Sequence, residues 1–81
     1  MGDKFGIGEA VEAMHNGQRV RRAGWNGKGM HLEIVKNGRF AHPSDTRDLE
    51  PFVVMFTAQK NFVPWLCSQA DLLATDWEIA G

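Results

Sequence analysis

The chain has 81 residues and a single cysteine, so it is too short for more than one domain and cannot form an internal disulfide. A formal net charge of −1 argues against a dedicated duplex-DNA binder, whose affinity depends on neutralising many phosphates. A core of this size is only marginally stable by itself, so we expect a single domain over residues 1–81 that self-associates.

The bulk features also predict where the protein works. The lone thiol is typical of a reducing compartment. The first residues contain no apolar stretch long enough for a signal peptide, and no segment approaches a transmembrane span. We therefore expect a soluble, cytoplasmic protein.

The first predicted element is a helix. Ile7, Ala10, Val11 and Met14 fall at i, i+3, i+4 and i+7, which places one apolar stripe along a helix. Gly17 is a natural end, because glycine adopts the left-handed conformation cheaply beyond a helix terminus.

Strands follow. Residues 18–22 form a short alternating stretch around Val20, and residues 30–36 alternate more clearly, with His31 on the polar side. Asn37-Gly38 predicts a two-residue hairpin that joins this strand to residues 39–42. Residues 43–51 are then expected to form a polar loop.

The second half adds strands and a short helix. Residues 51–57, "PFVVMFT", are the most strand-like stretch and the expected central strand, and residues 58–61 turn the chain back into residues 62–66. Ser68 and Asp71 resemble a capping box that begins a short helix, and Trp77 should enter the core from a final strand. The sum is an α+β fold with an N-terminal helix, a mostly antiparallel sheet and a short late helix.

The glycine-rich stretch "GWNGKG", residues 24–29, is the first candidate site. Its glycine spacing differs from the dinucleotide fingerprint, and a strand follows where that motif needs a helix. In one interpretation Asn26-Gly27 is a hairpin turn that carries Trp25 into the core. In the other, Trp25 stacks on a base while Arg22 or Lys28 lies near a phosphate.

A second polar and aromatic block lies near the C-terminus. Pro64 marks a strand edge or end, which places Trp65 near the margin of the sheet. The carboxylates of Asp71 and Asp76 are suited to ribose hydroxyls, because each oxygen accepts a hydrogen bond. Helix capping explains Ser68 and Asp71 equally well without any ligand.

Catalysis is not expected. The three histidines, His15, His31 and His42, form no metal-binding spacing, and no nucleophile elbow is present. Asp71 and Asp76 offer fewer ligands than magnesium-dependent phosphodiesterases use. We expect neither a metal nor a cofactor.

With these motifs in hand, the chain resembles the Thoeris anti-defence type 2 family. The similarity covers Phe5 to Ile79 and is most specific in "GWNGKGM" and "PW…SQ.DLLA.DW". It implies a phage sponge that sequesters cyclic ADP-ribose isomers without cleaving them, with some relatives also holding cyclic dinucleotides. It further implies a homotetramer, built as a dimer of dimers with pockets at subunit boundaries.

The resemblance and the charge pattern together give the expected binding residues. The family motifs point to two groups of positions, and charge adds two cations. The set is Arg22, Trp25, Asn26, Gly27, Lys28, Pro64, Trp65, Ser68, Asp71 and Asp76. Competing hypotheses are a sponge mainly for cyclic dinucleotides, a phosphodiesterase that opens the ring, a single-stranded nucleic-acid module, and a subunit without a ligand.

Overall fold

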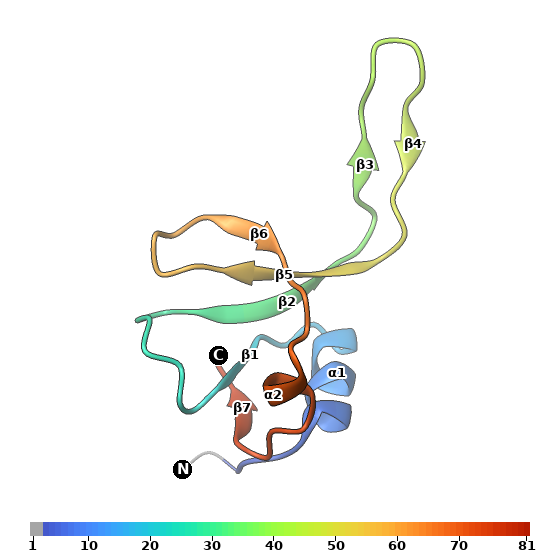
Figure 1. Ribbon diagram of the computed structural model, residues 1–81. Helices are drawn as coiled ribbons and strands as arrows, with labels where there is room; N and C mark the ends of the chain where they lie inside the picture. Colours follow the sequence, from blue (N-terminus) through green and yellow to red (C-terminus); the bar gives the residue numbers. More distant parts are fainter. Residues whose placement is uncertain (1–2) are drawn as a thin grey trace.

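The computed structural model describes residues 3–81 and confirms the α+β class. A five-stranded antiparallel sheet has the order β6-β5-β2-β1-β7, and β3 pairs with β4 apart from it. Figure 1 shows the two helices beside β1 and β7, and the β3–β4 hairpin projecting from the far end of the sheet. The elements are α1 (Ile7–His15), β1 (Val20–Arg22), β2 (His31–Val35), β3 (Arg39–Phe40), β4 (Arg47–Asp48), β5 (Phe52–Phe56), β6 (Phe62–Pro64), α2 (Gln69–Leu72) and β7 (Trp77–Ile79).

The predicted apolar stripe forms α1 and holds it on the sheet. Ala10 and Met14 are fully buried and the helix packs against β1, β2 and β7, but Val11 of the predicted stripe is 37% exposed because it lies at the edge of the contact. The backbone of Gly17 has a φ of +87°, a conformation that side-chain-bearing residues rarely adopt, so the predicted helix end is confirmed.

The core lies between α1 and one face of the sheet. Val20 pairs with Leu32 on one side and with Ile79 on the other, so side chains from three strands point to the same face. Trp77 is 0% exposed, as expected, and its indole N–H donates to the backbone oxygen of Asp71 at 3.0 Å. This contact ties α2 to the core.

The predicted Asn37-Gly38 hairpin is wrong. Asn37 has a φ of 62°, but Gly38 is not in the left-handed region, so the turn is not type I′. β2 pairs instead with β5, from His31 opposite Phe56 to Val35 opposite Phe52. Five apolar-rich pairs stabilise a sheet more than the two that β3 offers.

Three smaller corrections follow from this pairing. Residues 43–51 are not all loop, because they include β4, which pairs with β3. β5 is a strand as predicted, but β2 occupies the centre of the sheet. His31 is buried: its ring stacks on Phe56 with 5.1 Å between centroids, and Nε2 lies 2.9 Å from a carboxylate oxygen of Glu33.

Candidate ligand-binding site

Three tryptophans form one cluster on the helix-bearing side of the sheet. Trp25 and Trp65 both meet Trp77 edge to face, with ring centroids 5.5 Å and 6.0 Å apart. Trp77 is fully buried, whereas the two outer indoles are only half-buried. The ring of Trp25 therefore packs against the core, as the first interpretation predicts, and keeps exposed surface, while its stacking on a base stays a prediction.

Arg22 joins the glycine-rich loop to the second polar block. Its Nε donates to Asp76 at 2.8 Å and its Nη1 donates to Asp71 at 2.9 Å. The other carboxylate oxygen of Asp76 accepts from the backbone N–H of Gly24 at 3.3 Å. We call Arg22, Asp71 and Asp76 the brace, because they connect β1, α2 and the turn before β7.

The brace shifts the ionisation of its members. The hydrogen bond from Arg22 lowers the pKa of Asp76, and the Gly24 N–H adds to this effect. The hydrogen bonds to Asp76 and then Asp71 raise the pKa of Arg22. The sequence predicted Arg22 at a phosphate and the two aspartates at a ribose, whereas the structure first pairs them with one another.

A shallow pocket of about 280 Å³ lies beside Trp25. Arg21 at its wall is paired with Glu78 at 2.9 Å, an interaction that lowers the pKa of this glutamate. Among residues 3–81, no carboxylate lies within ion-pair distance of Lys28. This glycine-loop pocket is lined by Arg21, Arg22, Ala23, Trp25, Asn26, Gly27, Lys28, Gly29, Met30 and Glu78.

Gly27 sets the shape of this loop. A Cβ at Gly27 would lie 2.0 Å from the sulfur of Met30 and 3.0 Å from the Cβ of Ala58, so any larger residue here requires the Met30 side chain to move. β1 and β2 do form a hairpin, but Asn26-Gly27 is not its type I′ turn, since the positive φ, 80°, belongs to Gly29. The close approach at Gly27 is made by the protein's own methionine.

The remaining predicted residues occupy different places. Pro64 ends the edge strand β6, and Trp65 follows it, as the proline predicted. The hydroxyl of Ser68 accepts from the Asp71 N–H at 3.1 Å, so it caps α2. Neither Pro64 nor Ser68 lines the glycine-loop pocket.

The structure thus divides the predicted set in two. Arg22, Trp25, Asn26, Gly27 and Lys28 surround one pocket, and the brace and the tryptophan cluster link Asp71, Asp76 and Trp65 to it. Sequence reasoning missed five residues of the wall, Arg21, Ala23, Gly29, Met30 and Glu78. Gly29 had a signal as part of the glycine-rich stretch and Arg21 as a cation beside Arg22, whereas Glu78 needed the pairing of β1 with β7.

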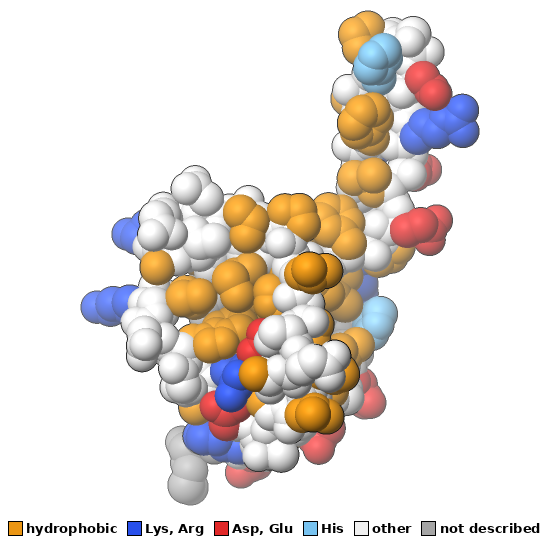
Figure 2. Space-filling view, in the orientation of Figure 1, with side chains coloured by type: hydrophobic (Ala, Val, Ile, Leu, Met, Phe, Trp, Pro, Cys, Tyr) orange, Lys and Arg blue, Asp and Glu red, His pale blue; other side chains and the backbone are white. Residues whose placement is uncertain are grey.

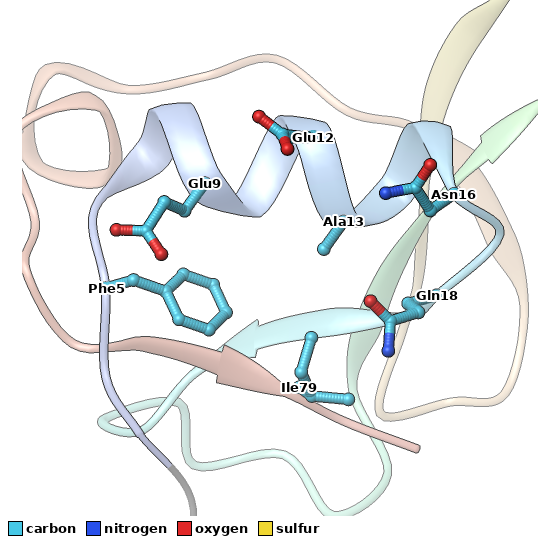
Figure 3. A pocket seen from close by; sticks show the side chains of 7 residues that line it. All are labelled: Phe5, Glu9, Glu12, Ala13, Asn16, Gln18 and Ile79. Carbon is cyan, nitrogen blue, oxygen red and sulfur yellow. The ribbon is translucent and has the colours of Figure 1, made fainter.

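A second pocket, of about 240 Å³, lies between α1 and β7. Figure 3 shows that its side chains come from the helix, the chain just before and just after it, and the last strand. Two carboxylates, Glu9 and Glu12, lie at this pocket, which disfavours a phosphate-bearing ligand. It contains none of the predicted site residues.

Two kinds of feature are absent from residues 3–81. Within that range, no three histidine, cysteine, aspartate or glutamate side chains are grouped so that they could hold a metal ion. In the same range, neither helix has the length and apolar character needed to cross a membrane.

Comparison with known proteins adds to this geometry. Residues 5–80 match the family model described as Tad2-like, the Thoeris anti-defense 2-like domain. The chain is also similar to Thoeris anti-defense 2 of Bacillus phage SP01, with 34% identity and 98% of each chain covered. The match spans α1 through β7 and therefore includes both pockets and the arm-like β3–β4 hairpin.

Proposed function

The chain belongs to the Thoeris anti-defense 2-like family, which supports a role in phage anti-defence, and from this premise we propose that it sequesters cyclic ADP-ribose-type immune signals. In this proposal the nucleotide is bound and not cleaved. The free concentration of the messenger falls, and the Thoeris effector is not activated. No catalytic group is required.

The observation that carries the proposal is the position of Trp25. Its half-buried ring packs edge to face against Trp77 and lines the glycine-loop pocket. Stacking of a base on an aromatic ring contributes about 1–3 kcal/mol. Lys28, which has no carboxylate partner among residues 3–81, supplies a positive charge for a phosphate at the same pocket.

The brace supports tight binding with slow release. Arg22 occupies one oxygen of Asp71 and one of Asp76, and a carboxylate offers roughly four acceptor positions. Acceptor capacity for ribose hydroxyls therefore remains at both aspartates. Because these groups are already held by hydrogen bonds, little side-chain freedom is lost on binding.

We further propose that the protein works as a homotetramer with the ligand at subunit boundaries. The glycine-loop pocket, about 280 Å³, is slightly smaller than the roughly 300–1,000 Å³ of most ligand sites. A second subunit over the half-exposed Trp25 and Trp65 would deepen it. Burial between subunits also excludes the water that assists dissociation.

The test compares two lysines. Lys28→Gln removes the charge at the pocket, and Lys60→Gln makes the same change at the exposed turn between β5 and β6. We expect Lys28→Gln to weaken binding of cyclic ADP-ribose isomers about tenfold, or about 1.4 kcal/mol, which is close to the lower end of the roughly 1.5–3 kcal/mol of a charge-assisted hydrogen bond. Lys60→Gln should bind as the unmodified chain does. Equal affinities in all three proteins would contradict the assignment of this pocket.

Release of the ligand separates binding from catalysis. The protein is incubated with the nucleotide and denatured by heat, and the released molecule is analysed by mass spectrometry. Intact recovery supports sequestration, and a linear product shows a phosphodiesterase. A thermal-shift panel compares cyclic ADP-ribose isomers with cyclic dinucleotides and a single-stranded oligonucleotide, and a preference for either of the last two would replace cyclic ADP-ribose as the ligand.

A further inference from the structure

The hairpin β3–β4 with its flanking residues, 38–49, forms an arm outside the main sheet. Its base is closed by the hydrogen bond from the Leu49 N–H to the Gly38 oxygen at 2.8 Å, and its two strands contain two residues each. Figure 1 shows that it extends away from both helices and from the five-stranded sheet. A hairpin this small is marginally stable in water unless it packs against another element.

One face of the arm exposes two apolar side chains, beside Arg47, whose charge is paired with Asp45. Phe40 is 58% exposed and Leu49 is 39% exposed. Phe40 lies opposite Arg47 in the register, and Leu49 is two residues beyond Arg47, so Phe40 and Leu49 share a face. In Figure 2, hydrophobic side chains continue from the sheet onto one side of the arm.

The charges of the arm are already balanced. Arg39 pairs with Asp48 at 3.3 Å, and Arg47 pairs with Asp45 at 3.0 Å. Basic arms that bind nucleic acid present unpaired cations to phosphates. The arm instead presents apolar surface and neutralised charge, which suits a protein partner.

The chain exposes more surface than a compact monomer of its mass. The chain exposes 5880 Å², whereas a compact monomer of 9.1 kDa would expose about 4,900 Å². The excess of about 1,000 Å² compares with the roughly 800 Å² that each partner contributes to a standard interface. The radius of gyration is 13.9 Å, against about 12 Å for a compact domain of this length.

A receiving surface is present on the same molecule. α1 packs on β1, β2 and β7, and β5 and β6 lie beyond it in the sheet, where Met55 and Val63 are on the same face as Leu32. Val63 and Leu66 in and after β6 are 41% and 91% exposed. Every copy of the chain therefore carries both an apolar arm and an apolar patch, which is the arrangement that reciprocal contacts in a symmetric assembly require.

We propose that the arm docks on a second copy of this chain and is an assembly element of the protein. The inference rests on the proposed self-association and goes beyond it, because it names the segment that crosses between subunits. It does not depend on nucleotide binding.

The test uses the full chain and two neighbouring substitutions. Phe40→Ser removes the apolar side chain of the arm, and Arg39→Gln alters the adjacent residue on the opposite face. We expect Phe40→Ser to raise the dissociation constant of the assembly at least about tenfold, by light scattering over a concentration series. Arg39→Gln should leave it unchanged. Because Phe40 lies outside the core, both variants should keep the unmodified circular dichroism spectrum.

Cross-linking locates the contact directly. Chains of normal and heavy isotopic composition are mixed and treated with a carbodiimide, which joins carboxylates to lysines. The arm contains Asp45 and Asp48 but no lysine, so peptides that link these aspartates to a lysine of the other isotopic form show that the arm reaches a second copy. Cross-links within one isotopic form only, or an unmodified chain that is monomeric at all concentrations, would overturn the inference.

The two proposals fail separately. A monomeric chain that still shifts its melting temperature with cyclic ADP-ribose overturns the docking of the arm and leaves sequestration intact. An assembly with light–heavy cross-links and no nucleotide binding does the reverse.

Discussion

Trp77 and Phe40 are both large aromatic residues, and the fold places them in opposite environments. Trp77 is completely enclosed by α1, α2 and its neighbouring strands, whereas Phe40 projects from the arm with 58% of its surface exposed. The region around Trp77 obtains its packing from the chain itself. The region around Phe40 obtains almost none. We therefore distinguish the body, which is the main sheet with its two helices and packs on itself, from the arm, which does not.

The largest expected effect comes from removing the centre of the body. Trp77→Ala should cost about 3–5 kcal/mol, which equals the whole stability usually available to a core of this size. We expect an unfolded protein at 25 °C by circular dichroism. Phe40→Ala should change the unfolding free energy of the isolated subunit by less than about 0.5 kcal/mol. Similar losses for both variants would remove the distinction between body and arm.

A substitution at Gly27 should lower the stability of the loop that joins the body to the candidate binding site. Gly27→Ala places a Cβ against the side chain of Met30, and overpacking of this kind costs about 1–3 kcal/mol. Gly8→Ala is the matched control, because nothing lies within 4 Å of its added Cβ and alanine favours a helix. The midpoint of chemical denaturation should therefore fall for Gly27→Ala and rise for Gly8→Ala. A stabilising Gly27→Ala would show that the loop relaxes freely.

The brace predicts that the stability of the fold depends on pH in the acid range. The folded state lowers the pKa of Asp76 below its ordinary value of 3.8, so this carboxylate stabilises the fold above that value and the contribution is lost as pH falls below it. Asp76→Asn should remove this part of the acid sensitivity. The melting temperatures of the two proteins should differ most at neutral pH and converge toward pH 2. A constant difference across this range would contradict the ion pair with Arg22.

The smallest effect is expected in the arm. Arg47→Gln breaks the exposed pair with Asp45, and such pairs contribute about 0–1 kcal/mol. The midpoint of urea denaturation should stay within experimental error. A clear loss would mean that the arm contributes to the stability of its own subunit, which would narrow the contrast with the body.

Local signals in the sequence predicted the parts of the body that depend on local chemistry. The apolar stripe predicted α1, the Ser68 cap predicted the start of α2, alternation predicted β2, and a strand-like composition predicted β5. The burial of Trp77 followed from its place at the start of a strand. In each case the signal lies in residues that are neighbours in the sequence.

The errors share a different cause. Asn37-Gly38 favoured a local hairpin, but pairing with β5 offered more apolar contacts, and this depends on residues about twenty positions away. His31 occupied a polar position in the alternation, yet Phe56 and Phe62 from two later strands cover it. The brace joins Arg22 to residues 49 and 54 positions later, so no motif in either block could reveal it.

The bridge between Phe5 and Trp77 has a consequence for biosynthesis. Their backbones exchange hydrogen bonds at 2.9 Å and 3.0 Å, so an early segment and the last strand complete the same region of the molecule. Pairings this distant along a chain are slow to form, because a large loop must close before they contribute any energy. While translation is under way, α1 and the first strands therefore expose their apolar faces until β7 leaves the ribosome. A nascent chain stopped before residue 77 would be a substrate for chaperones and proteases.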